Sequence, residues 1–138
     1  MVNKIITYET PVDRDYTDRA LAAGEVLRAG AGVRAAILER CRLNLESVRR
    51  LVERVPAVTI GAVGGGWSAV LRAPALCDDE GLCLRLLEQE GVAIHPGDSF
   101  GFPTGGYLVV SLLPPTEIVA EGISRTLRVV EDLAADRR

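Results

Sequence analysis

The sequence predicts an α+β protein of two layers, in which helices cover one face of a small, mostly antiparallel sheet of three or four strands. Three observations support this class. Apolar residues recur at helical spacing through 33–55, change to a period of two in 57–72, and return to helical spacing near the end of the chain. Clusters of glycine and proline separate these segments. The length of 138 residues fits one domain with a substantial core.

Residues 1–30 are expected to form an N-terminal arm and a broken helix. Thr10 precedes a proline and is therefore biased toward extended backbone. The stretch 20–29 is rich in alanine and leucine, which favours a helix, but glycines interrupt it. A break or bend is expected near 30–32.

A long helix is predicted over 33–55, ended by Pro56. Its apolar residues recur in steps of three and four, which marks a buried stripe. They are Val33, Ile37, Cys41, Leu45, Val48, Val52 and Val55. The opposite face is rich in arginine and is interpreted as a solvated surface. This helix opens a single α+β domain predicted for residues 31–134.

A hairpin is predicted next, with strands at 57–63 and 67–72 joined by Gly64–Gly66. The three glycines lead into a strand and no lysine follows them, so they indicate a turn and not a phosphate-binding loop.

The second half of the domain is again predicted to contain a helix followed by two strands. Asp78 or Asp79 is expected to cap a helix that runs to Glu90 and stops at Gly91. Strands at 92–95 and 107–113 then flank a glycine-rich loop. A last helix follows Pro115, and residues 135–138 are expected to fray.

Composition and charge exclude several classes of function. The net charge is −3 and no long basic run is present, which argues against nucleic-acid binding. No apolar run approaches the roughly 20 residues that a membrane-spanning helix needs. The first residues have too short an apolar core for a signal peptide, so a cytoplasmic location is expected.

Few residues could carry chemistry. The cysteines are Cys41, Cys77 and Cys83, and their spacing matches no zinc motif, so no metal site is expected. His95 lies close to Asp98 and Ser99, but residues so near in sequence rarely point at one another as a catalytic triad. The chain holds one lysine, Lys4, against 15 arginines. No catalytic residue is therefore predicted.

From Gly64 onward the chain resembles the C-terminal part, or small domain, of class I/II aminotransferases, which are fold-type I enzymes that depend on pyridoxal 5'-phosphate (PLP). The segment GGGWSAVLRAP is similar to the strand that enters this domain. The segment GVAIHPGDSFG matches a Gly-Val-x-x-x-Pro-Gly-x-x-Phe pattern through Gly91, Val92, Pro96, Gly97 and Phe100. The preceding segment AGAGVRAAILERCRLNLESVRRLV, residues 29–52, resembles the helix that joins the large domain to the small one.

The resemblance implies a cofactor that this chain does not hold by itself. In that family a lysine of the large domain forms a Schiff base with PLP, in a Ser-x-x-Lys context. Lys4 lies in VNKIIT and does not match that context. The resemblance therefore implies a small domain that is inactive alone, with no cofactor-binding residues, and a PLP-binding large domain as its missing partner in cis.

One position departs from the family pattern. The resemblance implies an arginine in the strand after the Pro-Gly loop, where it grips the substrate carboxylate, but this position is Val109. Either other residues fix the substrate, or the substrate is not an ordinary α-amino acid, or function was lost first and the strand repacked. An altered substrate is favoured, because a domain that had lost its function would not need to keep the Pro-Gly-x-x-Phe loop. If the chain joins a large domain, Trp67, His95, Phe100 and Val109 are the candidate walls of the substrate cleft.

Two alternatives stay open. The chain could be a small ligand-binding or regulatory module without any tie to PLP. It could also be an assembly module, because the arm and the long helix would expose apolar residues and form a homo-oligomer.

Overall fold

The computed structural model describes residues 14–136, with side chains from residue 21 onward. The predicted arm up to residue 13 and the last two residues of the predicted tail lie outside this range. The chain divides into two compact units, Met1–Ala36 and Ile37–Arg138.

The first unit consists of helix α1 (Arg14–Ala29) and the start of helix α2 (Ala31–Val52). The predicted break is confirmed at Gly30, which lies between the two helices, whereas Gly32 is inside α2. The large apolar residues of this unit are exposed; they are Leu21, Val26, Leu27 and Val33. None of the described residues of this unit belongs to the buried core.

In the second unit, α2 buries only the later part of its predicted apolar stripe. Cys41, Val48 and Val52 are buried, whereas Ile37 is 40% exposed. The predicted end at residue 55 is three residues too late, because the α-helix ends at Val52. Val55 is nevertheless buried, and its N–H donates to the Val52 carbonyl across 2.9 Å in a tightened last turn.

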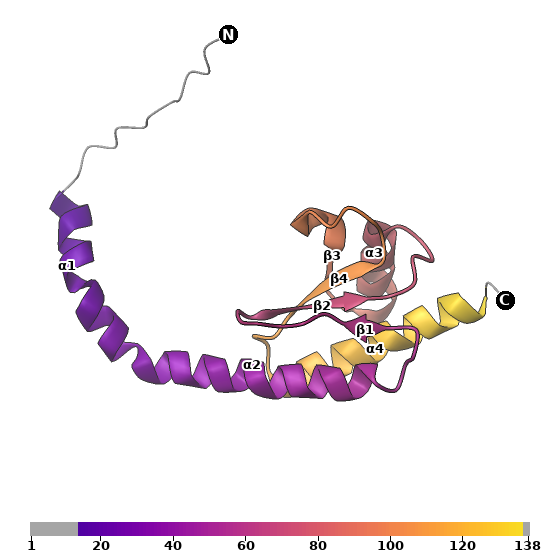
Figure 1. The fold of residues 1–138 in the computed structure, drawn as a ribbon, viewed down its shortest axis with the longest axis horizontal. Coiled ribbons are helices and arrows are strands. Elements are labelled where there is room, and N and C mark those ends of the chain that lie inside the picture. The colour runs from indigo at the N-terminus through magenta and orange to yellow at the C-terminus, as the bar shows by residue number, and fades with distance from the viewer. Residues whose placement is uncertain (1–13, 137–138) are drawn as a thin grey trace, which may run out of the picture. The chain divides into compact units, whose positions relative to one another are not determined.

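The sheet has four strands in the order β1-β2-β4-β3, and every neighbouring pair is antiparallel (Figure 1). The strands are β1 (Thr59–Ile60), β2 (Ser68–Arg72), β3 (His95–Pro96) and β4 (Tyr107–Ser111). The α+β class, the antiparallel hairpin of β1 and β2 and the strand count are thus confirmed, although the outer strands are shorter than predicted.

The predicted strand at 92–95 is wrong in position, since only His95 of that range joins the sheet. Gly91 adopts a left-handed conformation with a φ of 65° and ends the preceding helix as predicted. The N–H of Val92 then donates to the Leu86 carbonyl across 3.0 Å. The residue after the glycine is thereby tied to the helix end, and the chain reaches the sheet only at His95.

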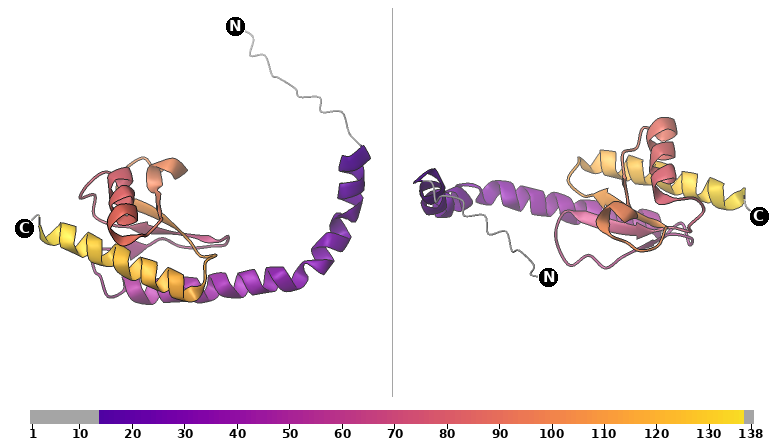
Figure 2. Two further views of the ribbon diagram at one scale, coloured as in Figure 1. Left: turned by 180° about the vertical axis from the view of Figure 1, so that it is seen from behind. Right: turned by 90° about the horizontal axis from the view of Figure 1, so that it is seen from above.

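Helices α3 (Asp79–Glu90) and α4 (Thr116–Ala135) lie on the same side of the sheet (Figure 2). Of the two predicted caps for α3, Asp78 is the N-cap, and its carboxylate accepts from the Gly81 N–H across 2.6 Å. A short 3-10 helix, η1 (Gly97–Phe100), follows β3.

The core fills the space between the helices and one face of the two long strands. Ala69 and Leu71 of β2 and Leu108 and Val110 of β4 face the helices. They share one buried cluster with residues of α2, α3 and α4, including Val48, Leu86 and Ile123. The confirmed arrangement of helices on one face leaves the other face of the sheet without an α-helix from the described part of the chain.

Candidate functional site

The sheet face that turns away from the helices is the candidate site, and we call it the open face. Side chains alternate between the two faces along a strand. Because Ala69, Leu71, Leu108 and Val110 face the core, their neighbours along the strands face outward. The open face of the three strands β2, β4 and β3 therefore holds Ser68, Val70, Arg72, Tyr107, Val109, Ser111 and His95.

Three of the four predicted cleft residues meet on this face. His95 and Val70 are both cross-strand partners of Val109, so the three form one row across the sheet. The ring of Phe100, on η1, stands edge-on to the His95 ring, with 5.9 Å between centroids and 66° between planes. Val109 is only 3% exposed, whereas Phe100 is 56% exposed.

Trp67 is placed differently. It directly precedes β2, and its backbone carbonyl accepts from the Leu112 N–H across 2.7 Å. Its indole is 62% exposed, and within the described residues no ring contact joins it to the His95 and Phe100 pair. The structure thus brings together His95, Phe100 and Val109 and leaves Trp67 apart from them.

Arg72 and two aromatic residues belong to the open face but are absent from the sequence-based prediction. Arg72 is the cross-strand partner of Tyr107, and its Cζ atom lies 5.7 Å from the centroid of the Tyr107 ring. Phe102 stacks on the same ring with 4.5 Å between centroids. The alternation in WSAVLR, which puts Arg72 on the face of Val70, was the signal that could have found it.

The loop that carries Phe100 and Phe102 is held tightly against β4. A Cβ atom at Gly97 would lie 2.4 Å from the Tyr107 Cβ, so only glycine allows this approach. Asp79, buried at the start of α3, accepts from the Gly106 and Tyr107 N–H groups across 2.6 and 3.2 Å. These contacts fix where the aromatic side chains stand.

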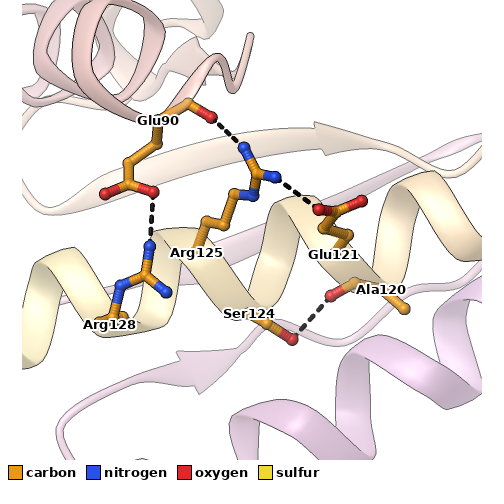
Figure 3. A network of polar contacts seen from close by, with 6 residues as sticks. All are labelled: Glu90, Ala120, Glu121, Ser124, Arg125 and Arg128. Carbon is orange, nitrogen blue, oxygen red and sulfur yellow. Dashed lines mark hydrogen bonds and ion pairs between the residues drawn. The ribbon is translucent and has the colours of Figure 1, made fainter.

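A cavity of about 420 Å³ lies elsewhere, between residues 91–94, the end of β4 and the first half of α4. None of the four predicted cleft residues lines it. At its edge Arg125 donates to the Glu90 carbonyl across 2.6 Å and pairs with Glu121 (Figure 3). Arg128 pairs with the Glu90 carboxylate, so α4 is fastened to the end of α3.

The cysteines do not form a reactive group. Cys41 and Cys83 are buried and Cys77 is exposed, and all three are free thiols. Burial, with a smaller contribution from the nearby Asp79 carboxylate, raises the pKa of Cys83 to about 11. Within residues 14–136 no three His, Cys, Asp or Glu side chains come together as a metal site.

Comparison with solved structures identifies the fold. LysN, an α-aminoadipate aminotransferase from Thermus thermophilus solved with N-(5'-phosphopyridoxyl)-L-leucine, matches 80% of this chain with a TM-score of 0.63 and 29% identity. A PLP-bound putative aminotransferase from Clostridium difficile 630 matches 73% with a TM-score of 0.64 and 23% identity. An aminotransferase from Mycobacterium tuberculosis matches 71% with a TM-score of 0.63 and 20% identity.

This chain covers only 30%, 27% and 26% of those three proteins. No protein-family model and no curated protein sequence matches it. Among the described residues no helix is long and apolar enough to span a membrane.

The fold is that of a small α+β domain of PLP-dependent aminotransferases. The resemblance to the C-terminal domain of class I/II aminotransferases is therefore confirmed at the level of the fold.

Proposed function

We propose that this chain is the small-domain portion of a PLP-dependent aminotransferase-like protein and has no amino-transfer activity alone. The observation that carries the proposal is the match to the T. thermophilus aminotransferase, which combines 29% identity with 80% coverage of this chain. In the parent protein the open face forms one wall of the substrate cleft. The cofactor and the reacting lysine lie on a PLP-binding large domain in cis.

The open face suits the role of a wall. Val70 and Val109 give it an apolar floor, and Phe100 projects from η1 with more than half of its surface exposed. Such a surface excludes water from a cleft and shapes the space for a substrate side chain. Its His95 and Phe100 rings contact each other, so the wall is formed before any partner is added.

The described residues do not fit PLP as a resident cofactor of this chain. PLP enzymes need a lysine for the Schiff base and a charged partner for the ring nitrogen. Residues 14–136 contain no lysine, because the only one is Lys4. The one arginine on the open face, Arg72, lies over Tyr107 with no acidic side chain among the residues of that face. No chemical step is therefore assigned to this chain.

A chimera tests the proposed role. The matched segment of the T. thermophilus aminotransferase is replaced by the residues of this chain that cover it. We expect a folded protein that binds PLP and transfers an amino group from at least one amino acid, with altered donor preference. A folded, PLP-loaded chimera that is inactive with all donors would contradict the proposal. If the chimera does not fold, a second one that exchanges only β2 and β4 answers the same question.

The isolated chain provides the complementary test. Equimolar PLP and borohydride are added, and the product is measured by mass spectrometry. We expect no more reduced adduct than a short lysine peptide gives under the same conditions. A stoichiometric adduct on Lys4 that disappears in the Lys4→Arg variant would show that the chain carries its own reactive lysine.

The partner surface is proposed to lie on the first unit. Leu21, Val26, Leu27 and Val33 are between 57% and 77% exposed, and the described residues of this unit contribute nothing to the core. Short helices in water need packing against another surface to be stable. The neighbouring structures are more than three times longer than the part that this chain covers, which leaves a large domain to pack there.

Without that domain, the isolated chain is expected to form a homo-oligomer through the same residues. Light scattering should give a mass above that of a monomer at high concentration. Leu21→Glu with Leu27→Glu should restore the monomer, whereas exchanging the exposed Arg85 of α3 for glutamate should not. A monomer at all concentrations would contradict this part of the proposal.

A further inference from the structure

We infer that the cavity between residues 91–94, the end of β4 and the first half of α4 docks an extended apolar segment of a partner polypeptide. One residue of that segment pairs with the backbone of Ser111, and the residues beside it place apolar side chains in the cavity. The inference does not depend on the proposed function, because none of the predicted cleft residues lines this cavity.

The backbone of Ser111 has an open hydrogen-bonding side. In β4 the Leu112 N–H donates to the Trp67 carbonyl on the β2 side, so the N–H and C=O of Ser111 point the other way, toward β3. Strand β3 reaches only as far as Val109, and Ala93, which would come next opposite Ser111, makes no backbone hydrogen bond to it. Within the described chain this donor and acceptor therefore have no backbone partner, and such a sheet edge can pair with another strand.

The open edge and the cavity form one site. Because the Val92 N–H is tied to the Leu86 carbonyl at the end of α3, residues 92–94 run apart from the edge of β4, and the cavity lies between them and α4. The side chain of Ser111 belongs to the open face, so the part of Ser111 that lines the cavity is its backbone.

The walls of the cavity suit apolar side chains. Val92 and Ile94 are half-buried on one side, and Ile118 of α4 is 58% exposed. Gly122 keeps the space open, since a Cβ added there would have the Val92 Cγ1 as a neighbour at an ordinary 3.8 Å. An apolar side chain that enters would remove these groups from water.

The charges beside the cavity favour a neutral occupant. Glu121 and Arg125 are the charged residues of its lining, and they pair with each other while Arg125 also donates to the Glu90 carbonyl (Figure 3). The Thr126 hydroxyl is likewise used, by the Gly122 carbonyl. A charge placed there would be buried without a partner, which is unfavourable.

These features together select a peptide strand as the occupant. The N–H and C=O of Ser111 match the C=O and N–H of one extended residue, as in the addition of a strand to a sheet edge. Residues directly opposite each other project to the same face of a sheet, so the partner of Ser111 faces outward and its two neighbours face the cavity. The expected segment therefore has a polar residue between two apolar ones.

A titration of the whole ¹⁵N-labelled chain with acetyl-Leu-Thr-Leu-amide tests the inference. We expect saturable shifts at Ser111, Ile94 and Gly122, and slower hydrogen exchange of the Ser111 amide because it gains an acceptor. N-methylation of the threonine should weaken binding about threefold to tenfold through one lost hydrogen bond. Aspartate in place of both leucines should abolish binding. 3-Methylbutanol, which is apolar but has no amide, should bind more weakly and leave the Ser111 exchange unchanged.

Substitutions on α4 distinguish the cavity from the helix surface. Gly122→Leu fills the space beside Val92 and should weaken peptide binding about tenfold, the loss of one buried leucine. Ser124→Leu puts the same side chain on an exposed position outside the lining and should change nothing. Thermal unfolding shows whether both variants are folded. If Gly122→Leu is not, Ile118→Ser, at an exposed position of the lining, should weaken binding in the same direction.

Binding that tolerates aspartate, is unchanged by N-methylation or persists in folded Gly122→Leu would overturn the inference. Equal binding of 3-methylbutanol would also overturn it, because it would show an apolar cavity without strand pairing. The same shifts on raising the protein concentration without peptide would show a second copy of this chain in the site instead. None of these results involves PLP or a large domain, so the inference and the proposed function can fail separately.

Discussion

The two faces of the sheet belong to the same strands but are built for different purposes. On the helix side, Leu71 and Leu108 are cross-strand partners and are at most 1% exposed. One step along each strand, Arg72 and Tyr107 are also partners, yet they lie on the open face and contact each other as a cation and a ring. A single register thus serves a dry core and a polar, aromatic surface.

This difference shows where the folding energy and the recognition groups are placed. The helix side buries aliphatic residues, which stabilise the fold through the area that they remove from water. The open face carries Arg72, His95 and the exposed Phe100 ring, and we propose that it forms one wall of a substrate cleft. Changes on the helix side should therefore act mainly on stability, and changes on the open face mainly on binding.

The largest expected effect comes from shortening a side chain on the helix side. Leu71→Ala leaves a cavity in a fully buried site and should lower the free energy of unfolding by about 2–5 kcal/mol. Val70→Ala, the neighbouring change on the open face, removes fewer buried atoms and should lower it by less than about 1.5 kcal/mol. Urea denaturation followed by circular dichroism measures both. Equal losses would contradict the distinction between the two faces.

A smaller effect is expected from the glycine that brings η1 against β4. Gly97→Ala would place a Cβ 2.4 Å from the Tyr107 Cβ and 2.9 Å from its carbonyl oxygen, so η1 must shift. Overpacking of this kind costs about 1–3 kcal/mol.

Gly101→Ala is the matched comparison for Gly97→Ala. Nothing lies within 4 Å of its added Cβ, but its φ of 79° is unfavourable for alanine. Both variants should lose stability. Only Gly97→Ala should also move the NMR signals of Tyr107 and Phe100, and unchanged signals would show that the close approach does not position the rings.

Asp79 provides a third test, because it connects the helix layer to the start of β4. Asp79→Asn keeps one acceptor oxygen for the Gly106 N–H, but it loses the negative charge and turns an NH2 group toward the Tyr107 N–H. It should lower the free energy of unfolding by about 1–3 kcal/mol, because one N–H donor loses its acceptor. Glu80→Gln removes an exposed charge from the same first turn of α3, and Glu80 makes no contact with Gly106, so this variant measures the contribution of the helix dipole alone. If the two variants lose the same stability by urea denaturation, the contact to β4 contributes nothing.

The two-layer arrangement and its long elements could be predicted from the sequence, whereas the short outer strands could not be placed correctly. Periodicity located the two long strands and the helices, because each of them buries a regular set of apolar residues. It misplaced the strand near His95, since the apolar run Val92–Ile94 is tied to the end of α3 instead of entering the sheet. Local pattern cannot distinguish these two ways of burying an apolar segment.

The candidate site was predicted in part. His95, Phe100 and Val109 do lie together. The family resemblance selected His95 and Phe100 beside the Pro-Gly pair and Val109 as the position of the expected arginine. Arg72 was not predicted, because the resemblance expects its arginine at the position of Val109. Its place on the open face follows from strand register, with Arg72 opposite Tyr107 and its Cζ atom 5.7 Å from the centroid of that ring. Register depends on which strands pair across the loop.

The smallest effect concerns Cys83, on the helix side, compared with the exposed Cys77. Because its pKa is raised to about 11, the Cys83 thiol is neutral at pH 8, and burial also limits access. Iodoacetamide at pH 8 should label Cys77 fully before Cys83, as read by mass spectrometry. A pKa raised in the folded state favours the neutral form, so its contribution to stability is complete below about pH 9 and declines as the pH rises toward 11. In the Cys83→Ala variant, the part of the loss of stability between about pH 9 and 11 that comes from this thiol should be absent. Equal labelling of Cys77 and Cys83 in the native protein would show that the α3 side of the core is open to solvent.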